Sequence, residues 1–346
     1  MQIKTIYMST CLSLSLAFFA STTISADVTK LQQIADAERD VAYIGLRLRT
    51  YVSSNGSRTL EEIVVHNTAK NSFYKVESVL GQHKPSENDN KPDNQNRDTD
   101  RNRDDRRRRG REFRWERQRS QFTTKEIELV AQNYELEHTR WGEKIAGYET
   151  DILIIKPKFP GRPSKHIYFA RKNGVILKVQ DFDADGIFRR MFVYTRISFD
   201  AKVVQNKWNA IKKDIHTNPR NNRNITLAEA KKILKKKPIQ PKFIPKGFQL
   251  QNIEKHQYRD SHPIQFKYTD GMLEFRIIEV TGDIPRRDRG SPVIKIGHTD
   301  VHKFQRGPTT AFGWETSDIR FLLIGTLPAT ELQKVVESII HVAEQK

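Results

Sequence analysis

Three aspartates at alternate positions, Asp181, Asp183 and Asp185, are followed by Gly186 and have the spacing that opens a calcium-binding loop. Such a loop needs a bidentate carboxylate at its twelfth position, where this chain has Phe192. Aspartate and glycine in this order are also typical of a β-turn, because aspartate bonds its own backbone and glycine tolerates positive φ. We therefore predict a turn here and no calcium site.

A histidine pair, His298 and His302, has the four-residue spacing of zinc ligands on a helix. The surrounding residues predict a strand, and no third ligand stands nearby in the sequence. The chain contains no nucleophile elbow, phosphate-binding loop, dinucleotide-binding glycine motif or HExxH motif. Its single cysteine, Cys11, supports neither a disulfide framework nor a cysteine-based zinc site. We predict a non-enzymatic protein without a metal or another cofactor.

The first 26 residues have the composition of a secretory signal. Lys4 supplies a positive start, an apolar stretch runs from Met8 to Ala20, and the small residue Ala26 suits a cleavage site. Cleavage there would leave a mature chain beginning at residue 27, without cysteine. No apolar run approaches the ~20 residues that a membrane span needs. The mature chain is thus predicted to be soluble and periplasmic.

The net charge of +18 is concentrated in two places. Residues 201–260 carry 15 Lys and Arg against 4 Asp and Glu, and residues 97–119 carry 11 Arg against 6 acids. An exported protein meets little nucleic acid, so we expect an anionic lipid, a polysaccharide or an acidic protein as partner. Simple solvation of the charges is the alternative. The candidate partner-binding surface is a lysine cluster on one short helix and its exit: Lys231, Lys232, Lys235, Lys236 and Lys237.

Residues 27–200 predict a curled antiparallel sheet with a helical lid. Alternating apolar residues and turn signals, such as Asn55-Gly56, indicate successive strands, and 29–39 and 123–133 have helical patterns. Residues 82–112 lack aliphatic side chains and predict a disordered basic insertion. A curled sheet can offer its concave face to an acyl chain, although the same residues could be ordinary core under helices. The candidate ligand-binding residues of that face are Ile44, Leu46, Leu48, Ile63, Val65, Val175, Leu177 and Val179.

A smaller α+β domain is predicted at 226–346, after a polar linker at 201–225. Thr226 and Glu229 form a capping box that opens a helix, and strands are expected around 252–259, 264–269, 272–280, 292–304 and 318–325. A final amphipathic helix begins near Ala329. The fold class is therefore α+β, in two domains.

Several short motifs resemble the RseB/MucB family of periplasmic sigma-E regulators of the envelope stress response. In the first domain they are a glycine turn at 145–147, Pro157-Lys158, Arg162, Gly174 and the turn 183–186. In the second domain they are IPKGFQL (244–250), YTDGMLEFRIIEV (268–280) and FLLIGTLPATELQKVVESI (321–339). The chain departs from the family at Tyr168 and Ala170, where Trp and Asp are common, and in the insertion.

The resemblance implies a first domain with the half-barrel fold of the lipoprotein carrier LolA. It further implies a second domain that contacts a membrane-anchored anti-sigma factor, with lipid or lipoprotein signals releasing that partner. Two other functions remain open. A LolA-like lipid or lipoprotein carrier would need only the first domain, and a basic protein that docks on anionic envelope polymers would bind them in a salt-sensitive way.

Overall fold

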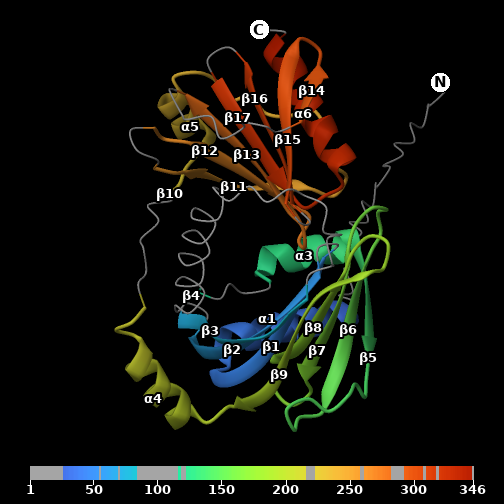
Figure 1. The fold of residues 1–346 in the computed structure, drawn as a ribbon, viewed down its shortest axis with the longest axis vertical. Coiled ribbons are helices and arrows are strands. Elements are labelled where there is room, and N and C mark those ends of the chain that lie inside the picture. The colour runs from blue at the N-terminus through green and yellow to red at the C-terminus, as the bar shows by residue number, and fades with distance from the viewer. Residues whose placement is uncertain are drawn as a thin grey trace, which may run out of the picture.

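The computed structural model describes residues 26–53, 56–68, 71–83, 116–117, 122–215, 223–257, 261–281, 292–306, 309–316 and 319–344. Residues 1–25 of the predicted signal and 84–112 of the predicted insertion lie outside these ranges. The first two residues of the predicted insertion, Gln82 and His83, are instead the end of a strand. The described residues form two antiparallel sheets, each with its own helices, stacked end to end (Figure 1).

The first sheet has nine strands in the order β4-β3-β2-β1-β9-β8-β7-β6-β5, and every pairing is antiparallel. Most neighbours along the chain are also neighbours in the sheet, as short turns between alternating segments require. β1 pairs with β9, which is distant in the chain, and the open order leaves β4 and β5 at the two edges. The strands are β1 (Tyr43–Ser53), β2 (Gly56–Thr68), β3 (Asn71–His83), β4 (Glu116–Arg117), β5 (Tyr134–Thr139), β6 (Thr150–Pro157), β7 (Ser164–Ala170), β8 (Ile176–Phe182) and β9 (Phe188–Ser198).

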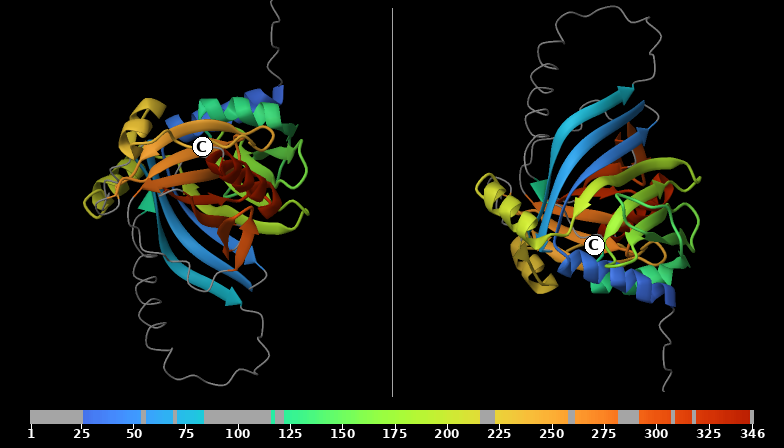
Figure 2. Two further views of the ribbon diagram at one scale, coloured as in Figure 1. Left: turned by 90° about the horizontal axis from the view of Figure 1, so that it is seen from above. Right: turned by 90° about the horizontal axis from the view of Figure 1, so that it is seen from below.

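One face of this sheet, called the inner face here, is covered by α1 (Ala26–Asp40) and α3 (Thr124–Asn133). Leu31 and Ile34 of α1 and Val130 of α3 are fully buried against apolar side chains of β6, β7 and β8. The sheet curls around these helices (Figure 2), and α1 contacts β2 as well as β5 and β6. The predicted curled sheet with a helical lid is confirmed.

The predicted linker at 201–225 is wrong for its first half. Residues Ala201–Ile211 form α4, whose Val204 and Ile211 are buried and whose Trp208 stacks on Phe73 at a ring-centroid distance of 5.8 Å. The helix covers the outer face at β1 and β2. Its apolar residues recur at intervals of four and three, and the surrounding lysines and asparagines conceal this period in the sequence.

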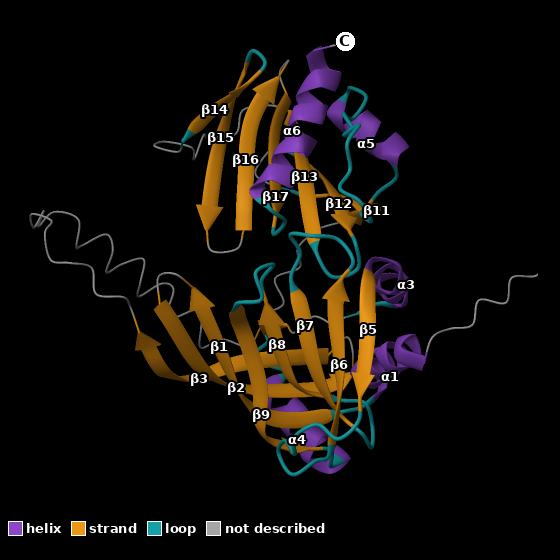
Figure 3. Ribbon diagram, turned by 90° about the vertical axis from the view of Figure 1, so that its right-hand side faces the viewer, coloured by secondary structure: helices purple, strands orange, loops and turns teal. Residues whose placement is uncertain are grey.

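The second sheet has eight strands in the order β10-β11-β12-β13-β17-β16-β15-β14. The helix α6 (Ala329–Glu344) packs against it, and α5 (Leu227–Leu234) lies at the β11 end (Figure 3). The strands are β10 (Arg223–Asn224), β11 (Gln249–Lys255), β12 (Ile264–Thr269), β13 (Glu274–Thr281), β14 (Val293–Ile296), β15 (Thr299–Arg306), β16 (Thr309–Thr316) and β17 (Ile319–Gly325).

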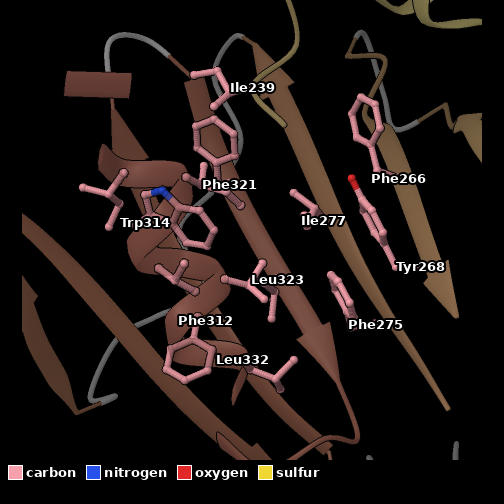
Figure 4. Packing of buried hydrophobic residues seen from close by; sticks show 14 of the residues in the cluster. Ile239, Phe266, Tyr268, Phe275, Ile277, Phe312, Trp314, Phe321, Leu323 and Leu332 are labelled. Carbon is pink, nitrogen blue, oxygen red and sulfur yellow. The ribbon is translucent and has the colours of Figure 1, made fainter. Parts of the chain in front are cut away.

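Aromatic and aliphatic side chains from the strands and α6 fill this second core (Figure 4). Trp314 stacks on Phe321 and Tyr268 on Phe275, at centroid distances of 5.1 and 4.8 Å. The predicted final helix and the Thr226–Glu229 capping box are confirmed. Two details differ: 292–304 is a hairpin of two strands, and β16 was not expected. The α+β class with a smaller second sheet unit is confirmed.

A buried histidine is expected to make the first unit sensitive to acid. His66 is 3 % exposed, stacks on Tyr43 at 4.8 Å and lies 2.9 Å from the Ser72 hydroxyl through Nδ1. Burial lowers the pKa of His66 to about 4, against a smaller opposing effect of the Glu38 backbone.

Because the unfolded chain takes up the proton near the ordinary pKa of 6.5, we expect stability to fall as the pH drops from about 6.5 towards 4. The full difference is worth about 3 kcal/mol of unfolding free energy. Urea unfolding at several pH values measures it. His66→Gln should flatten this pH dependence; an unchanged slope in the variant would contradict it.

Candidate functional site

The eight residues predicted to line one apolar face lie on two opposite faces. Leu48 and Lys178 both pair with Val193, so Lys178 shares the side of Leu48 and its neighbour Val179 points the other way. The prediction of one shared face is therefore wrong, because pleat parity is set by pairing partners that the sequence does not display. By register, Val179 lies on the inner face, whereas the outer face has Ile44, Leu46, Leu48, Ile63 and Val65. Val175 and Leu177 have no register partner and belong to the core cluster that contains Val64 and Tyr194.

Neither set forms an open apolar surface. Val175, Leu177 and Val179 are at most 3 % exposed and belong to the cores under α1 and α3. On the outer face, Val65 is fully buried near α4, while the four other residues are half-buried. A role in ligand binding thus stays a prediction.

The predicted lysine cluster is a solvent-exposed surface. Lys231 and Lys232 lie in the last turns of α5, Lys235 is its left-handed cap with φ 55°, and Lys236 and Lys237 follow. All five side chains are exposed. Cations at this end of α5 also interact favourably with the negative end of the helix dipole, so these lysines contribute to the stability of the helix itself.

The aspartate cluster is a turn. One carboxylate oxygen of Asp183 accepts the backbone N–H groups of Asp185 and Ile187, and the other accepts Arg189 at 2.7 Å. Gly186 has a φ of 76°, a backbone conformation that glycine adopts without the steric cost of a Cβ atom. Among the described residues no group of three His, Cys, Asp or Glu side chains has a geometry for a metal ion.

The densest polar constellation lies where the two sheet units meet. Arg162, in the loop between β6 and β7, donates from Nη1 to Asp270 Oδ2 at 3.0 Å, and Asp270 lies in the turn between β12 and β13. Their side chains are 1 % and 0 % exposed. A buried ion pair of this kind holds its two segments in one arrangement, because separating them leaves two charges to be solvated.

Further groups complete the bonding of this pair. Tyr134 donates its hydroxyl to the same Asp270 oxygen at 2.8 Å, and the other Asp270 oxygen accepts the backbone N–H groups of Met272 and Leu273. Arg162 donates from Nη2 to the carbonyl of Lys246. Burial, with the Asp270 carboxylate, raises the pKa of Tyr134, so its hydroxyl keeps the proton it donates.

The rest of the junction is held by close backbone approach. Asn133, at the end of α3, donates to the carbonyls of Gly247 and Asp270, both at 3.0 Å. A Cβ atom on Gly271 would meet Glu126 O and Val130 N at 2.7 Å each. Glycine is therefore required where the β12–β13 turn rests on α3. The guanidinium of Arg162 also lies over two aromatic rings, those of Phe159 at 4.7 Å and Phe248 at 5.2 Å.

Sequence reasoning did not identify this junction as a site, although its signal was present. Arg162, the Pro-Lys-Gly of 245–247 and the Asp-Gly of 270–271 all belong to motifs that the family resemblance rests on. They lie about a hundred residues apart in the chain and meet in one buried network. The arrangement has no nucleophile or general base open to a substrate among these residues; it can orient two units and present a shared surface.

Comparison with known proteins supports the fold. No protein-family model matches the chain, and no curated protein matches its sequence. Among solved structures, the chain is similar to MucB in complex with MucA(peri), with a TM-score of 0.50, 15% identity, and coverage of 90% of this chain and 97% of that one. The Pseudomonas aeruginosa MucA/MucB complex gives a TM-score of 0.52, 16% identity, and coverage of 91% and 98%. The chain has a MucB-like fold across both units.

Proposed function

We propose that this protein is a non-enzymatic periplasmic regulator that binds a membrane-anchored anti-sigma-type protein. The observation that carries the proposal is the likeness over about 90% of this chain and nearly all of a MucB chain that was solved with MucA. It covers the second sheet unit as well as the first. A protein that only carries lipid has no need of that second unit, whereas a regulator can use both units to hold a partner.

The junction supports the same proposal. Because Arg162 and Asp270 fix one unit on the other, a partner that contacts both units meets a preorganised surface and loses less entropy on binding. We propose boundaries of 27–211 for the first domain and 223–344 for the second, with the α5 lysines as a contact surface for the partner.

Export by the signal at 1–26 is part of the proposal. Among the described residues, no helix combines the length and the apolar character needed to cross a membrane. In the proposed function, binding of a lipid or lipoprotein would release the anti-sigma-type partner. The apolar part of the inner face on β6, β7 and β8 is filled by α1 and α3, so an acyl chain would reach it only if one of these helices moved.

Purification of the tagged protein from its own envelope extract, followed by mass spectrometry of retained molecules, tests the proposal. A stoichiometric single-span membrane protein is expected. Lipids or lipoproteins without such a protein would favour the carrier, and polysaccharide released by salt would favour the polymer-binding function.

The same purification tests the lysine surface. We expect Lys235→Glu combined with Lys237→Glu to retain at least fivefold less of the membrane protein, because both exposed cations are reversed. The control reverses two exposed lysines near α4, Lys202 and Lys213, and should retain the normal amount. Equal loss in both variants would show that total charge matters and that this surface does not.

A further inference from the structure

A row of polar side chains crosses the inner face of the first sheet near the second unit. Its members are register partners on adjacent strands, and it begins three residues after Arg162, which contacts the second unit. We call it the rim row. Its members, from β7 to β3, are Lys165, Asp181, Arg190, Tyr51, Arg58 and Gln82.

Positive charge exceeds negative charge along this face. Asp181 is held by two cations, Lys165 and Arg190, the latter at 2.6 Å. Although burial alone would raise it, these two cations lower the pKa of Asp181, so the carboxylate stays ionised. Each cation beyond the first leaves one positive charge that Asp181 does not neutralise.

The same arrangement recurs deeper on the inner face. Glu62 is held by Arg47 at 2.7 Å and by Arg49 at 3.1 Å. Arg49 and Arg190 are diagonal neighbours, because Arg49 pairs with Phe192, two residues from Arg190 on β9. This second cluster also has another anion nearby, because Glu116 accepts the hydroxyl of Tyr74, whose ring lies under Arg49. The surplus positive charge therefore lies mainly in the Asp181 cluster, where partial desolvation makes it unfavourable until an anion joins it.

The middle of the rim row is accessible and partly apolar, whereas Lys165 at its β7 end is buried. The side chain of Arg190 is 52% exposed, Tyr51 is 38% exposed, and Val79, which lies next to the row on β3, is 41% exposed. Nε and Nη2 of Arg190 already contact Asp181, so a ligand carboxylate would accept the remaining N–H groups of this guanidinium. Tyr51 and Val79 supply apolar contact beside it. The surface therefore suits a ligand with several carboxylates and some apolar side chains.

The length of the row favours a peptide. From Lys165 to Arg58 the row crosses five strands, and the ~4.8 Å strand spacing gives a length of roughly 19 Å, about six extended residues. A single lipid phosphate would occupy one cation cluster and leave the other. The chain's own segment 97–119 carries 11 Arg against 6 acids and does not complement this surface.

We propose that the rim row binds an extended acidic segment of the partner protein. This inference rests on the proposed regulatory function and names the chemistry of the segment that the regulator recognises.

The test uses the purified full-length chain and a fluorescein-labelled octapeptide of alternating Glu and Leu. We expect saturable binding that weakens at least tenfold when Gln replaces Glu, and again when the salt is raised from 50 to 300 mM. Arg190→Glu should raise the Kd at least tenfold, and Arg190→Gln severalfold. Arg196→Glu is the matched control: it changes the same charge on the same strand, pairs with Leu46 on the outer face and is exposed. It should change the Kd less than twofold.

Equal weakening by Arg190→Glu and Arg196→Glu would overturn the inference, because total charge alone would then explain binding. Vesicles of phosphatidylglycerol form a second arm; loss of vesicle binding with intact peptide binding in Arg190→Glu would also overturn it. The envelope purification separates the two proposals. Normal retention of the membrane protein by Arg190→Glu refutes the rim row alone, whereas no retained protein with the unaltered chain refutes the regulator.

Discussion

Replacing Asp270 with alanine is expected to lower the free energy of unfolding by about 3–5 kcal/mol. The substitution leaves the guanidinium of Arg162, only 1 % exposed, without its carboxylate. It also removes the acceptor for the Tyr134 hydroxyl and for two backbone N–H groups of the β12–β13 turn. Buried donors of the folded protein cost most when their acceptor alone is deleted, because they are then left without a hydrogen bond.

Urea unfolding followed by tryptophan fluorescence measures this loss, with Trp208 packed on the first sheet and Trp314 buried in the second core. The control is Asp300→Ala, which removes an exposed ion pair with Lys295 and should cost less than about 1 kcal/mol. Adding Arg162→Met to Asp270→Ala should recover part of the loss, because the orphaned charge is gone. Equal effects of Asp270→Ala and Asp300→Ala would contradict the buried junction.

Replacing Gly271 with alanine is expected to push the two units apart. Its φ of 101° strains any other residue, and the added Cβ would lie 2.7 Å from backbone atoms of α3 that cannot rotate away. Strain of about 1 kcal/mol and overpacking of about 1–3 kcal/mol together predict a loss of roughly 2–4 kcal/mol.

Gly186 is the matched control for this substitution. It has a similar positive φ, 76°, and nothing within 4 Å of an added Cβ, so Gly186→Ala carries the backbone strain without the clash. Thermal unfolding compares the stabilities, and small-angle X-ray scattering compares the radii of gyration. We expect a larger radius for Gly271→Ala only. An unchanged radius of gyration in both variants, with equal stability, would contradict the expected clash between residue 271 and α3.

The sequence was sufficient for the elements and the class. Period-two alternation with turn residues identified most strands of both sheets, and the capping box of Thr226 and Glu229 gave the start of α5. These signals are local, because a strand, a turn or a cap is specified by residues close together in the chain. In α4 the many polar residues conceal the apolar period, so the sequence predicts a linker where the structure has a helix.

The sequence could not assign faces or bring distant residues together. Leu48 and Val179 looked equivalent as alternating apolar residues, yet pairing through β9 put them on opposite sides of one sheet. Arg162 and Asp270 stand 108 positions apart, and only the packing of α3 on the β12–β13 turn makes them one buried pair. Alternation of apolar and polar residues shows that a strand has two different sides. Strand pairing decides which side is buried, and the docking of the two units decides which charges meet. Such contacts are long-range, so they exist only once the whole chain has folded.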